Sequence, residues 1–146
     1  MKNKWQNIEE VIVVLNDDSS KDANEFIRTL ELLGKNAKVV ILSREKQEST
    51  KEQSKVTLLT NKDFSLFGKP KSEIALSVFK TNFDLLLVVD SFEGKPEKRM
   101  KKVKAKLSVG LNLKEPNTFF DINMSTRSNS IEHLINFTKE IVEKIK

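Results

Sequence analysis

The sequence predicts an α/β domain, in which helices cover both faces of a mostly parallel sheet in a Rossmann-like or flavodoxin-like three-layer sandwich. The first observation is that continuous apolar runs, typical of strands buried on both faces, recur along the chain. The second is that segments with apolar residues at helical spacing separate several of these runs. The third is the length, because 146 residues suit a single domain that spans residues 1–146.

The first part of the chain predicts a strand, a helix and a second strand. Residues 11–15 are five consecutive apolar residues, four of them β-branched, and indicate a buried strand. Ser19 or Ser20 caps the helix that follows, and Gly34 ends it. The inward positions of this helix recur every three or four residues: Ala23, Phe26, Ile27, Leu30 and Leu33. Residues 38–43 then predict a second buried strand.

The middle of the chain predicts a loop, two further strands and a helix. Residues 44–55 are wholly polar and indicate a solvated loop or a frayed helix inside the domain, and residues 56–60 indicate a third, weaker strand. A Gly-Lys-Pro sequence at 68–70 opens a helix that runs to about Lys80, because proline is favoured in the first helical turn. Residues 83–90 contain an apolar run as long as that at 11–15 and predict a central strand.

The last part predicts a basic helix, two short strands and a final helix. A second Gly-Lys-Pro sequence at 94–96 opens the basic helix. The inward residues of that helix are Met100, Val103 and Leu107. Residues 107–111 and 119–122 predict short strands, and Asn129 and Glu132 form a capping box for the final helix. The apolar stripe of the final helix comprises Ile131, Leu134, Ile135, Thr138, Ile141, Val142 and Ile145.

Composition excludes several classes of protein. The chain has no cysteine, which rules out a disulfide, a thiolate nucleophile and a Cys-ligated zinc, and which fits a reducing compartment. The longest apolar run, at 85–89, is far shorter than the ~20 residues that a membrane-spanning helix needs. The N-terminus has a basic start without an apolar stretch behind it, so we expect no secretory signal and a cytoplasmic protein.

Positive charge is concentrated between residues 95 and 106. Seven cationic side chains and Glu97 give this stretch +6, whereas the whole chain carries +5, so the other residues sum to −1. The candidate partner-binding residues of this basic helix are Lys95, Lys98, Arg99, Lys101, Lys102 and Lys106. Like charges one helical turn apart cost a few tenths of a kcal/mol per pair, and a bound anion would relieve this repulsion.

The basic helix has two interpretations. A concentrated patch favours an anionic partner such as RNA, a ribonucleoprotein or an acidic protein surface. The alternative is a lysine-rich solvent face that keeps the domain soluble. The stretch has no interleaved aromatic residues, RNA-binding signature or DNA-binding motif that would favour one nucleic acid by sequence.

A second candidate site follows from the predicted sheet. Ligands of open α/β sheets bind beyond the carboxyl ends of the strands, in the crevice where the strand order reverses. The loops after the first, the central and the last strand supply the candidate residues Asp17, Asp18, Asp90, Ser91 and Arg127. The first loop lacks the glycine-rich turn that admits a pyrophosphate, and its two aspartates repel phosphate. We therefore expect no dinucleotide cofactor.

The aspartates of this crevice also suggest a Mg²⁺ site like that of receiver domains. Asp17, Asp18 and Asp90 supply the oxygen ligands that Mg²⁺ prefers. The spacing differs from a receiver domain, because a whole strand-helix unit at 56–80 precedes Asp90. In the simpler interpretation, Asp17 and Asp18 are solvated residues ahead of a helix N-terminus, where negative charge is favourable.

No catalytic constellation is present in the sequence. The single histidine, His133, falls on the solvent face of the final helix, and without cysteine or a second histidine it cannot anchor a usual zinc site. The G-x-S-x-G turn of a serine hydrolase is absent as well. Trp5 is expected to pack the N-terminal arm. These observations predict a non-catalytic protein without cofactor or metal.

Several motifs, taken in order, resemble an uncharacterised bacterial domain-of-unknown-function family. They are Asp63-Phe64, Gly68-Lys69-Pro70, Phe83-Asp84-Leu85-Leu86, the run from Lys104 to Gly110, and Phe119-Phe120-Asp121-Ile122. The resemblance implies a Rossmann-like α/β fold, and the family has no assigned activity. Many members carry a longer basic N-terminal helix, which this chain lacks apart from Lys2 and Lys4.

Residues 83–90 and 106–110 are also similar to the N-terminal lobe of heptosyltransferase-like enzymes. Those enzymes need a second lobe to hold the sugar nucleotide, and 146 residues leave no room for one. The expected function is therefore a cytoplasmic binding or adaptor module that docks an anionic partner through the basic helix. The alternative is a domain that binds a small ligand, a nucleotide or Mg²⁺ in the carboxyl-edge crevice.

Overall fold

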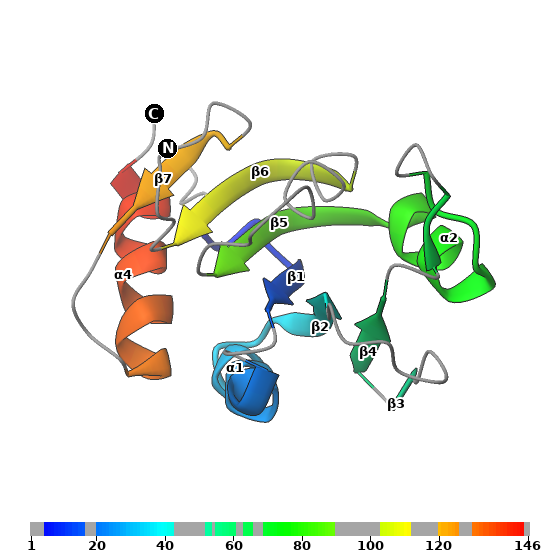
Figure 1. Cartoon of the computed structure of the whole chain (residues 1–146). Helices are drawn as coiled ribbons and strands as arrows, with labels where there is room; N and C mark the ends of the chain where they lie inside the picture. Colours follow the sequence, from blue (N-terminus) through cyan, green and yellow to red (C-terminus); the bar gives the residue numbers. More distant parts are fainter. Residues whose placement is uncertain are drawn as a thin grey trace.

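The computed structural model describes residues 5–16, 20–42, 52–53, 55–60, 63–65, 69–89, 103–111, 120–125 and 130–144. Its strands are β1 (Glu10–Leu15), β2 (Asn36–Leu42), β3 (Glu52–Gln53), β4 (Val56–Leu59), β5 (Asn82–Val89), β6 (Lys104–Leu111) and β7 (Ile122–Met124). Its helices are the 3₁₀ turn η1 (Ser20–Asp22), α1 (Ala23–Leu32), α2 (Glu73–Lys80) and α4 (Ile131–Lys144). Figure 1 shows the strands side by side in one twisted sheet.

The sheet has the strand order β3-β4-β2-β1-β5-β6-β7. All neighbours pair in parallel except β3, which adds an antiparallel edge to β4. Counted without β3, the parallel strands follow the order 3-2-1-4-5-6 of a doubly wound sheet, which reverses direction between β1 and β5. The predicted α/β class with a mostly parallel, Rossmann-like sheet is confirmed.

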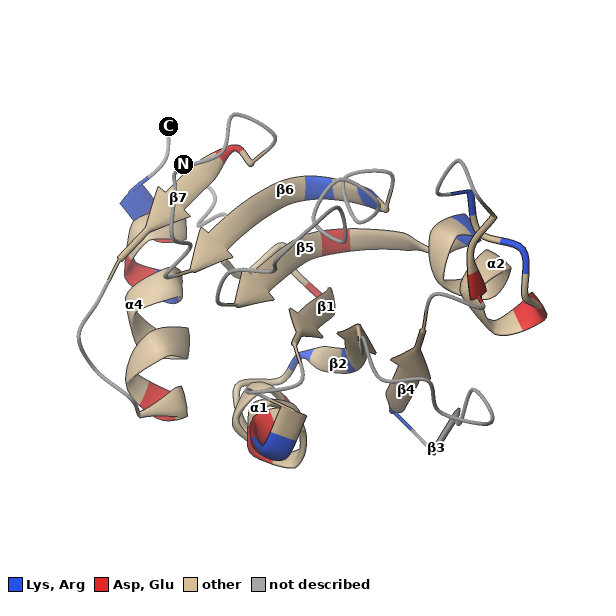
Figure 2. Ribbon diagram, in the orientation of Figure 1, with Lys and Arg blue, Asp and Glu red and all other residues tan. Residues whose placement is uncertain are grey.

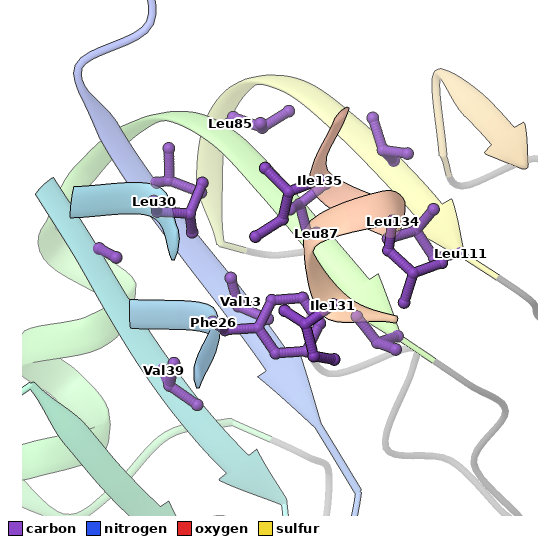
Figure 3. Packing of buried hydrophobic residues seen from close by; sticks show 14 of the residues in the cluster. Val13, Phe26, Leu30, Val39, Leu85, Leu87, Leu111, Ile131, Leu134 and Ile135 are labelled. Atoms are coloured by element: carbon purple, nitrogen blue, oxygen red, sulfur yellow. The ribbon is translucent and has the colours of Figure 1, made fainter. Parts of the chain in front are cut away.

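Helices cover both faces of this sheet. Helices α1 and α4 pack on one face, and α2 packs on the other (Figure 1). Figure 3 shows Phe26 and Leu30 of α1 and Ile131 of α4 packed against strand residues such as Val13 and Leu87. A parallel sheet buries its strands in this way because each crossover returns a helix across one face.

Strand β5 is buried on both faces. Its alternate residues Leu85 and Leu87 belong to the core under α1 and α4, whereas Leu86 and Val88 belong to the core under α2. The strand lies between β1 and β6 and pairs with both. The prediction of an interior strand at 83–90 is therefore confirmed for residues 83–89, since Asp90 lies outside the described residues.

The first helix begins later than predicted and ends where predicted. The α-helix begins at Ala23 after the 3₁₀ turn, with Asp22 at the N-cap, so the cap lies two or three residues after the predicted serines. Gly34 ends the helix as predicted, at φ +80°, a backbone conformation that favours glycine. The Gly34 and Lys35 N–H groups donate to the Glu31 and Leu30 carbonyls at 2.9 and 3.0 Å, which satisfies the end of the helix.

The second helix begins later than predicted. Pro70 forms an isolated antiparallel bridge with Phe64 instead of entering the first helical turn. Ser72 is the N-cap, and its hydroxyl accepts a hydrogen bond from the Ala75 N–H at 3.1 Å. The predicted polar loop is also interrupted, because Glu52–Gln53 pair with β4 as β3. In both places pairing with another segment overrides the local sequence signal, which was a helix-opening proline at Pro70 and a polar composition at 52–53.

The C-terminal elements follow the predicted order with shifted ends. Strand β7 begins at Ile122, at the end of the predicted strand 119–122. The described residues Phe120 and Asp121 therefore lie before the strand. Ser130 caps α4, since its hydroxyl accepts the His133 N–H at 3.3 Å, and the predicted cap Asn129 lies outside the described residues. The buried residues of α4 match the predicted stripe and are Ile131, Leu134, Ile135, Thr138 and Val142, with Ile141 half-buried.

The predicted basic helix is wrong at its C-terminal end. Lys106 and Leu107 lie in β6, which starts at Lys104, three residues before the predicted strand. Strand pairing explains the difference, because Lys104 pairs with Asn82 and Leu107 pairs with Leu85. Val103, just before the strand, is buried as predicted, whereas residues 90–102 lie outside the described part of the chain. Within the described residues, no helix is long and apolar enough to cross a membrane.

Candidate functional site

The carboxyl edge of the sheet has its topological reversal between β1 and β5. These strands are direct neighbours, with Val14 beside Val88, so the loops that follow them leave the sheet at adjacent points. Residues 17–18 follow β1, and residues 90–91 follow β5. The third predicted loop follows β7, which β6 separates from β5. The strand order thus places the strands before two of the three predicted loops side by side, namely β1 and β5.

The candidate residues of that crevice lie outside the described part of the chain. They are Asp17, Asp18, Asp90, Ser91 and Arg127. Their grouping therefore stays a prediction. Among the residues that the structure describes, no three histidine, cysteine, aspartate or glutamate side chains gather in a way that could hold a metal ion. His133 is exposed on α4, as the sequence predicted.

The described part of the basic stretch lies at the opposite, amino edge of the sheet. Lys106 is exposed on β6, and its ammonium lies 3.3 Å from a carboxylate oxygen of Asp84 on β5. Lys104, two residues earlier on the same strand, is exposed as well. The remaining predicted partner-binding residues, namely Lys95, Lys98, Arg99, Lys101 and Lys102, lie outside the described residues.

Asp84 joins three strands at this edge. Its Oδ2 accepts hydrogen bonds from the main-chain N–H groups of Glu9 at 2.8 Å and of Glu10 at 2.9 Å, at the start of β1. Its Oδ1 faces Lys106 on β6. The hydrogen bond from the Glu10 N–H, helped by those from Glu9 and Lys106, holds the pKa of Asp84 below its ordinary value despite partial burial.

An open pocket of about 580 Å³ lies at the amino ends of β5 and β6. Its lining residues are Asn82, Phe83, Asp84, Lys104, Ala105 and Lys106. Two ammonium groups and one carboxylate give this lining a net charge of +1. Figure 2 shows basic residues at the start of β6 beside an acidic residue on β5. The pocket offers donors to an anionic group and lacks an assigned general base or nucleophile.

The lowered pKa of Asp84 predicts a specific loss of stability in acid. Because the folded-state pKa lies below the unfolded value, the stabilisation is present above the unfolded pKa and disappears as the pH falls through the folded pKa. Asp84→Asn is expected to lower the free energy of unfolding at pH 7 by about 1–3 kcal/mol, as charged hydrogen bonds do. Urea unfolding should show this difference shrinking between pH 5 and pH 2.5.

The matched control for this measurement is Glu140→Gln, which removes the same charge from an exposed position on α4. Its free energy of unfolding is expected to equal that of the wild type at neutral and at acid pH. A difference between Asp84→Asn and the wild type that stays constant with pH would contradict the role of the ionised carboxylate.

The other two motif aspartates in the described residues also bind main-chain N–H groups. Asp63 is buried, and its Oδ2 accepts the Thr60 N–H at 2.8 Å. Asp121 accepts the Ser108 N–H at 2.9 Å, and its own N–H donates to the Ser108 hydroxyl at 3.0 Å. All three motif aspartates thus anchor loops or strand ends through hydrogen bonds to the main chain.

Lys35 was not singled out by the sequence, yet it is buried and 7% exposed. Its ammonium donates to the main-chain carbonyls of Trp5 at 2.7 Å and Ile8 at 2.5 Å, and it lies 4.8 Å from the Trp5 ring centroid. Burial lowers the pKa of Lys35. The buried Trp5 packs the N-terminal arm as predicted, and Lys35 fixes that arm to the start of β2.

The parallel sheet, its strand order and the helices on both faces define the chain as a doubly wound α/β protein. A family model described as "Family of unknown function (DUF6913)" matches residues 1–145, and the chain belongs to this family. The predicted membership of a family without assigned function is therefore confirmed. No curated protein and no solved structure matches the chain.

Proposed function

We propose that this protein is a non-catalytic binding or adaptor module of the bacterial cytoplasm that docks RNA through its basic stretch, residues 95–106. The observation that carries the proposal is the charge distribution, because the stretch holds +6 while the other residues sum to −1. A local field of this kind attracts a polyanion much more strongly than a dispersed excess of lysine does. A ribonucleoprotein presents the same phosphates, and an acidic protein surface is the competing partner.

The geometry at the end of the stretch supports an extended ligand. Lys104 and Lys106 alternate with Ala105 along β6, so both ammonium groups leave the same face of the strand. Two residues of a strand span about 6.7 Å. This spacing is close to that of successive phosphates along an extended single strand of nucleic acid. Phosphate contacts of this kind position a strand without selecting its sequence.

The experiment that tests the function is a thermal-shift screen of the full chain. We expect a ten-residue oligouridylate at 100 times its dissociation constant to stabilise the fold by about 2.7 kcal/mol. Mg²⁺, ATP and a nucleotide sugar should leave the unfolding temperature unchanged. Stabilisation by one of these small ligands, without an effect of RNA, would overturn the proposal.

A second candidate function uses the carboxyl-edge crevice. The reversal of strand order between β1 and β5 favours it, because doubly wound proteins bind small ligands at that point. Asp17, Asp18 and Asp90 would then hold Mg²⁺, or the crevice would take a nucleotide as in the lobe of a heptosyltransferase-like enzyme. Saturable Mg²⁺ binding that Asp17→Asn or Asp90→Asn removes would establish this function.

The described end of the basic stretch, at Lys104 and Lys106, and the predicted crevice lie at opposite edges of the sheet. Strands β5 and β6 have eight residues each, which places roughly 25 Å between their amino and carboxyl ends. Substitutions at Lys104 or Lys106 should therefore leave a ligand in the crevice unaffected. Variants at one edge serve as controls for the other.

A further inference from the structure

The pocket at the amino ends of β5 and β6 contains cations in two different situations. Lys106 is held in place by Asp84, although its side chain remains 82% exposed. Within the described part of the chain, no carboxylate pairs with Lys104. Asn82, which pairs with Lys104 across the strands, adds an amide group to the lining. The pocket thus presents two cationic donors and a neutral one around an open volume of about 580 Å³.

The position of Asp84 in this pocket is fixed by the fold. Its Oδ2 is occupied by the N–H groups of Glu9 and Glu10, so the carboxylate cannot turn away from the pocket without breaking both hydrogen bonds. Its side chain is 18% exposed, and its Oδ1 faces Lys106. One negative charge therefore stays beside the two lysines and weakens their attraction for an anion.

We propose that this pocket is a phosphate subsite for single-stranded RNA, in which Lys104 and Lys106 contact successive phosphates and Asp84 limits the affinity. The proposal rests on the proposed function and adds its location, its contacts and the sign of each residue's effect. Lys104 and Lys106 supply the attraction. Alternate residues of a strand lie about 6.7 Å apart, which matches the two lysines to successive phosphates. Asp84 keeps Lys106 at the pocket and opposes the bound phosphate by its charge.

A purely structural role of these residues predicts a different pattern of effects. If the pocket binds phosphate, Asp84→Asn removes a repulsive charge and tightens RNA binding while the fold loses stability. A structural role of Asp84 alone lowers stability and leaves the affinity unchanged or reduced. The opposite signs for affinity and stability in one variant therefore distinguish a phosphate subsite from a structural ion pair.

The test is fluorescence anisotropy of labelled ten-residue oligouridylate with the full chain at 50 mM salt. Lys104→Gln should weaken binding about fivefold, the factor expected for a single charge pair about 4 Å apart in water. Lys106→Gln should weaken it more, because it also leaves the Asp84 charge unpaired. Asp84→Asn should tighten binding about fivefold. Each lysine variant should make the log–log salt dependence shallower by about 0.7.

The matched control is Lys21→Gln, which removes one exposed cation ahead of α1 at the other edge of the sheet. It should bind RNA within twofold of the wild type. If Lys21→Gln weakens RNA binding more than the pocket variants do, the subsite is overturned and the RNA contact lies at the carboxyl edge. Both lysine variants change exposed side chains, so they decide the question even if Asp84→Asn fails to fold.

Failure of the subsite is distinguishable from failure of the proposed function. Wild-type binding of RNA that none of the three pocket variants alters overturns the subsite and leaves residues 95–102 of the basic stretch as the proposed docking surface. Absence of wild-type binding at 50 mM salt overturns both. Binding of poly-L-glutamate in preference to oligouridylate also overturns the subsite, because the partner is then an acidic protein surface.

Discussion

Replacing Leu86 by aspartate is expected to abolish folding. Leu86 is 2% exposed on β5, beside Ile12 of β1, in the core that α2 covers. A carboxylate at this position is buried without a partner, which costs several kcal/mol. Small domains are stable by only about 5–15 kcal/mol, so the substitution removes most or all of this margin. Circular dichroism and urea unfolding measure the result.

The matched control is Leu32→Asp, which makes the same chemical change at a leucine that is 81% exposed at the end of α1. It should change the free energy of unfolding by about 1 kcal/mol or less, since a negative charge at a helix C-terminus is only mildly unfavourable. Cooperative unfolding of Leu86→Asp at a wild-type urea concentration would contradict the burial of β5 on both faces.

Reversal of two charges in the basic stretch is expected to abolish RNA binding. The double substitution Lys98→Glu and Lys102→Glu lowers the charge of residues 95–106 from +6 to +2. Two attractive contacts become repulsive, so affinity should fall by at least a hundredfold at 50 mM salt, as the loss of several phosphate contacts implies. Stability should hardly change, because the predicted spacing directs both side chains away from Met100 and Val103. Anisotropy and urea unfolding test the two expectations.

A control with the same net charge separates the local patch from the overall charge. Lys21→Glu combined with Lys144→Glu also removes four units, at exposed positions on η1 and α4. It should retain most of the affinity. If the reversed protein binds RNA like this control, and recovers an unchanged set of partners in a pull-down, then the lysines of the stretch serve solubility alone.

The sequence predicted the interior of the sheet well. Residues 11–15 and 85–89 are continuous apolar runs, and such runs are typical of strands that are buried on both faces. Apolar residues at helical spacing located α1 and α4 in the same way, because their apolar stripes are wide and regular. The strand order was not predicted, since an apolar run does not identify its neighbour.

Element ends were predicted less well where the residues are polar. Lys104 and Lys106 have no apolar periodicity of their own, and pairing with β5 decides that they form a strand. Pro70 was assigned to a helix by a local preference that its bridge to Phe64 overrides. Tertiary contacts of this kind are invisible to a local pattern.

The candidate site was likewise predicted from the sequence only in part. The concentration of charge at 95–106 was visible in the sequence, whereas the role of Asp84 was not. Asp84 binds main-chain groups 74 and 75 residues away and a lysine on the next strand. The alternation of Lys104, Ala105 and Lys106 is the pattern that could have placed both lysines on one strand face, but the sequence analysis assigned Lys106 to the basic helix.

The salt dependence of RNA binding tests the central claim most directly. Contacts of a single strand with four cations of the stretch (Lys98, Arg99, Lys101 and Lys102) predict a slope of about −3 in a plot of the logarithm of the association constant against the logarithm of the salt concentration. The measurement is anisotropy of oligouridylate with the full chain between 50 and 300 mM salt, repeated with the Lys98→Glu, Lys102→Glu protein. A slope near −3 that the reversal removes supports the account, and a slope near zero, or no binding at 50 mM salt, contradicts it.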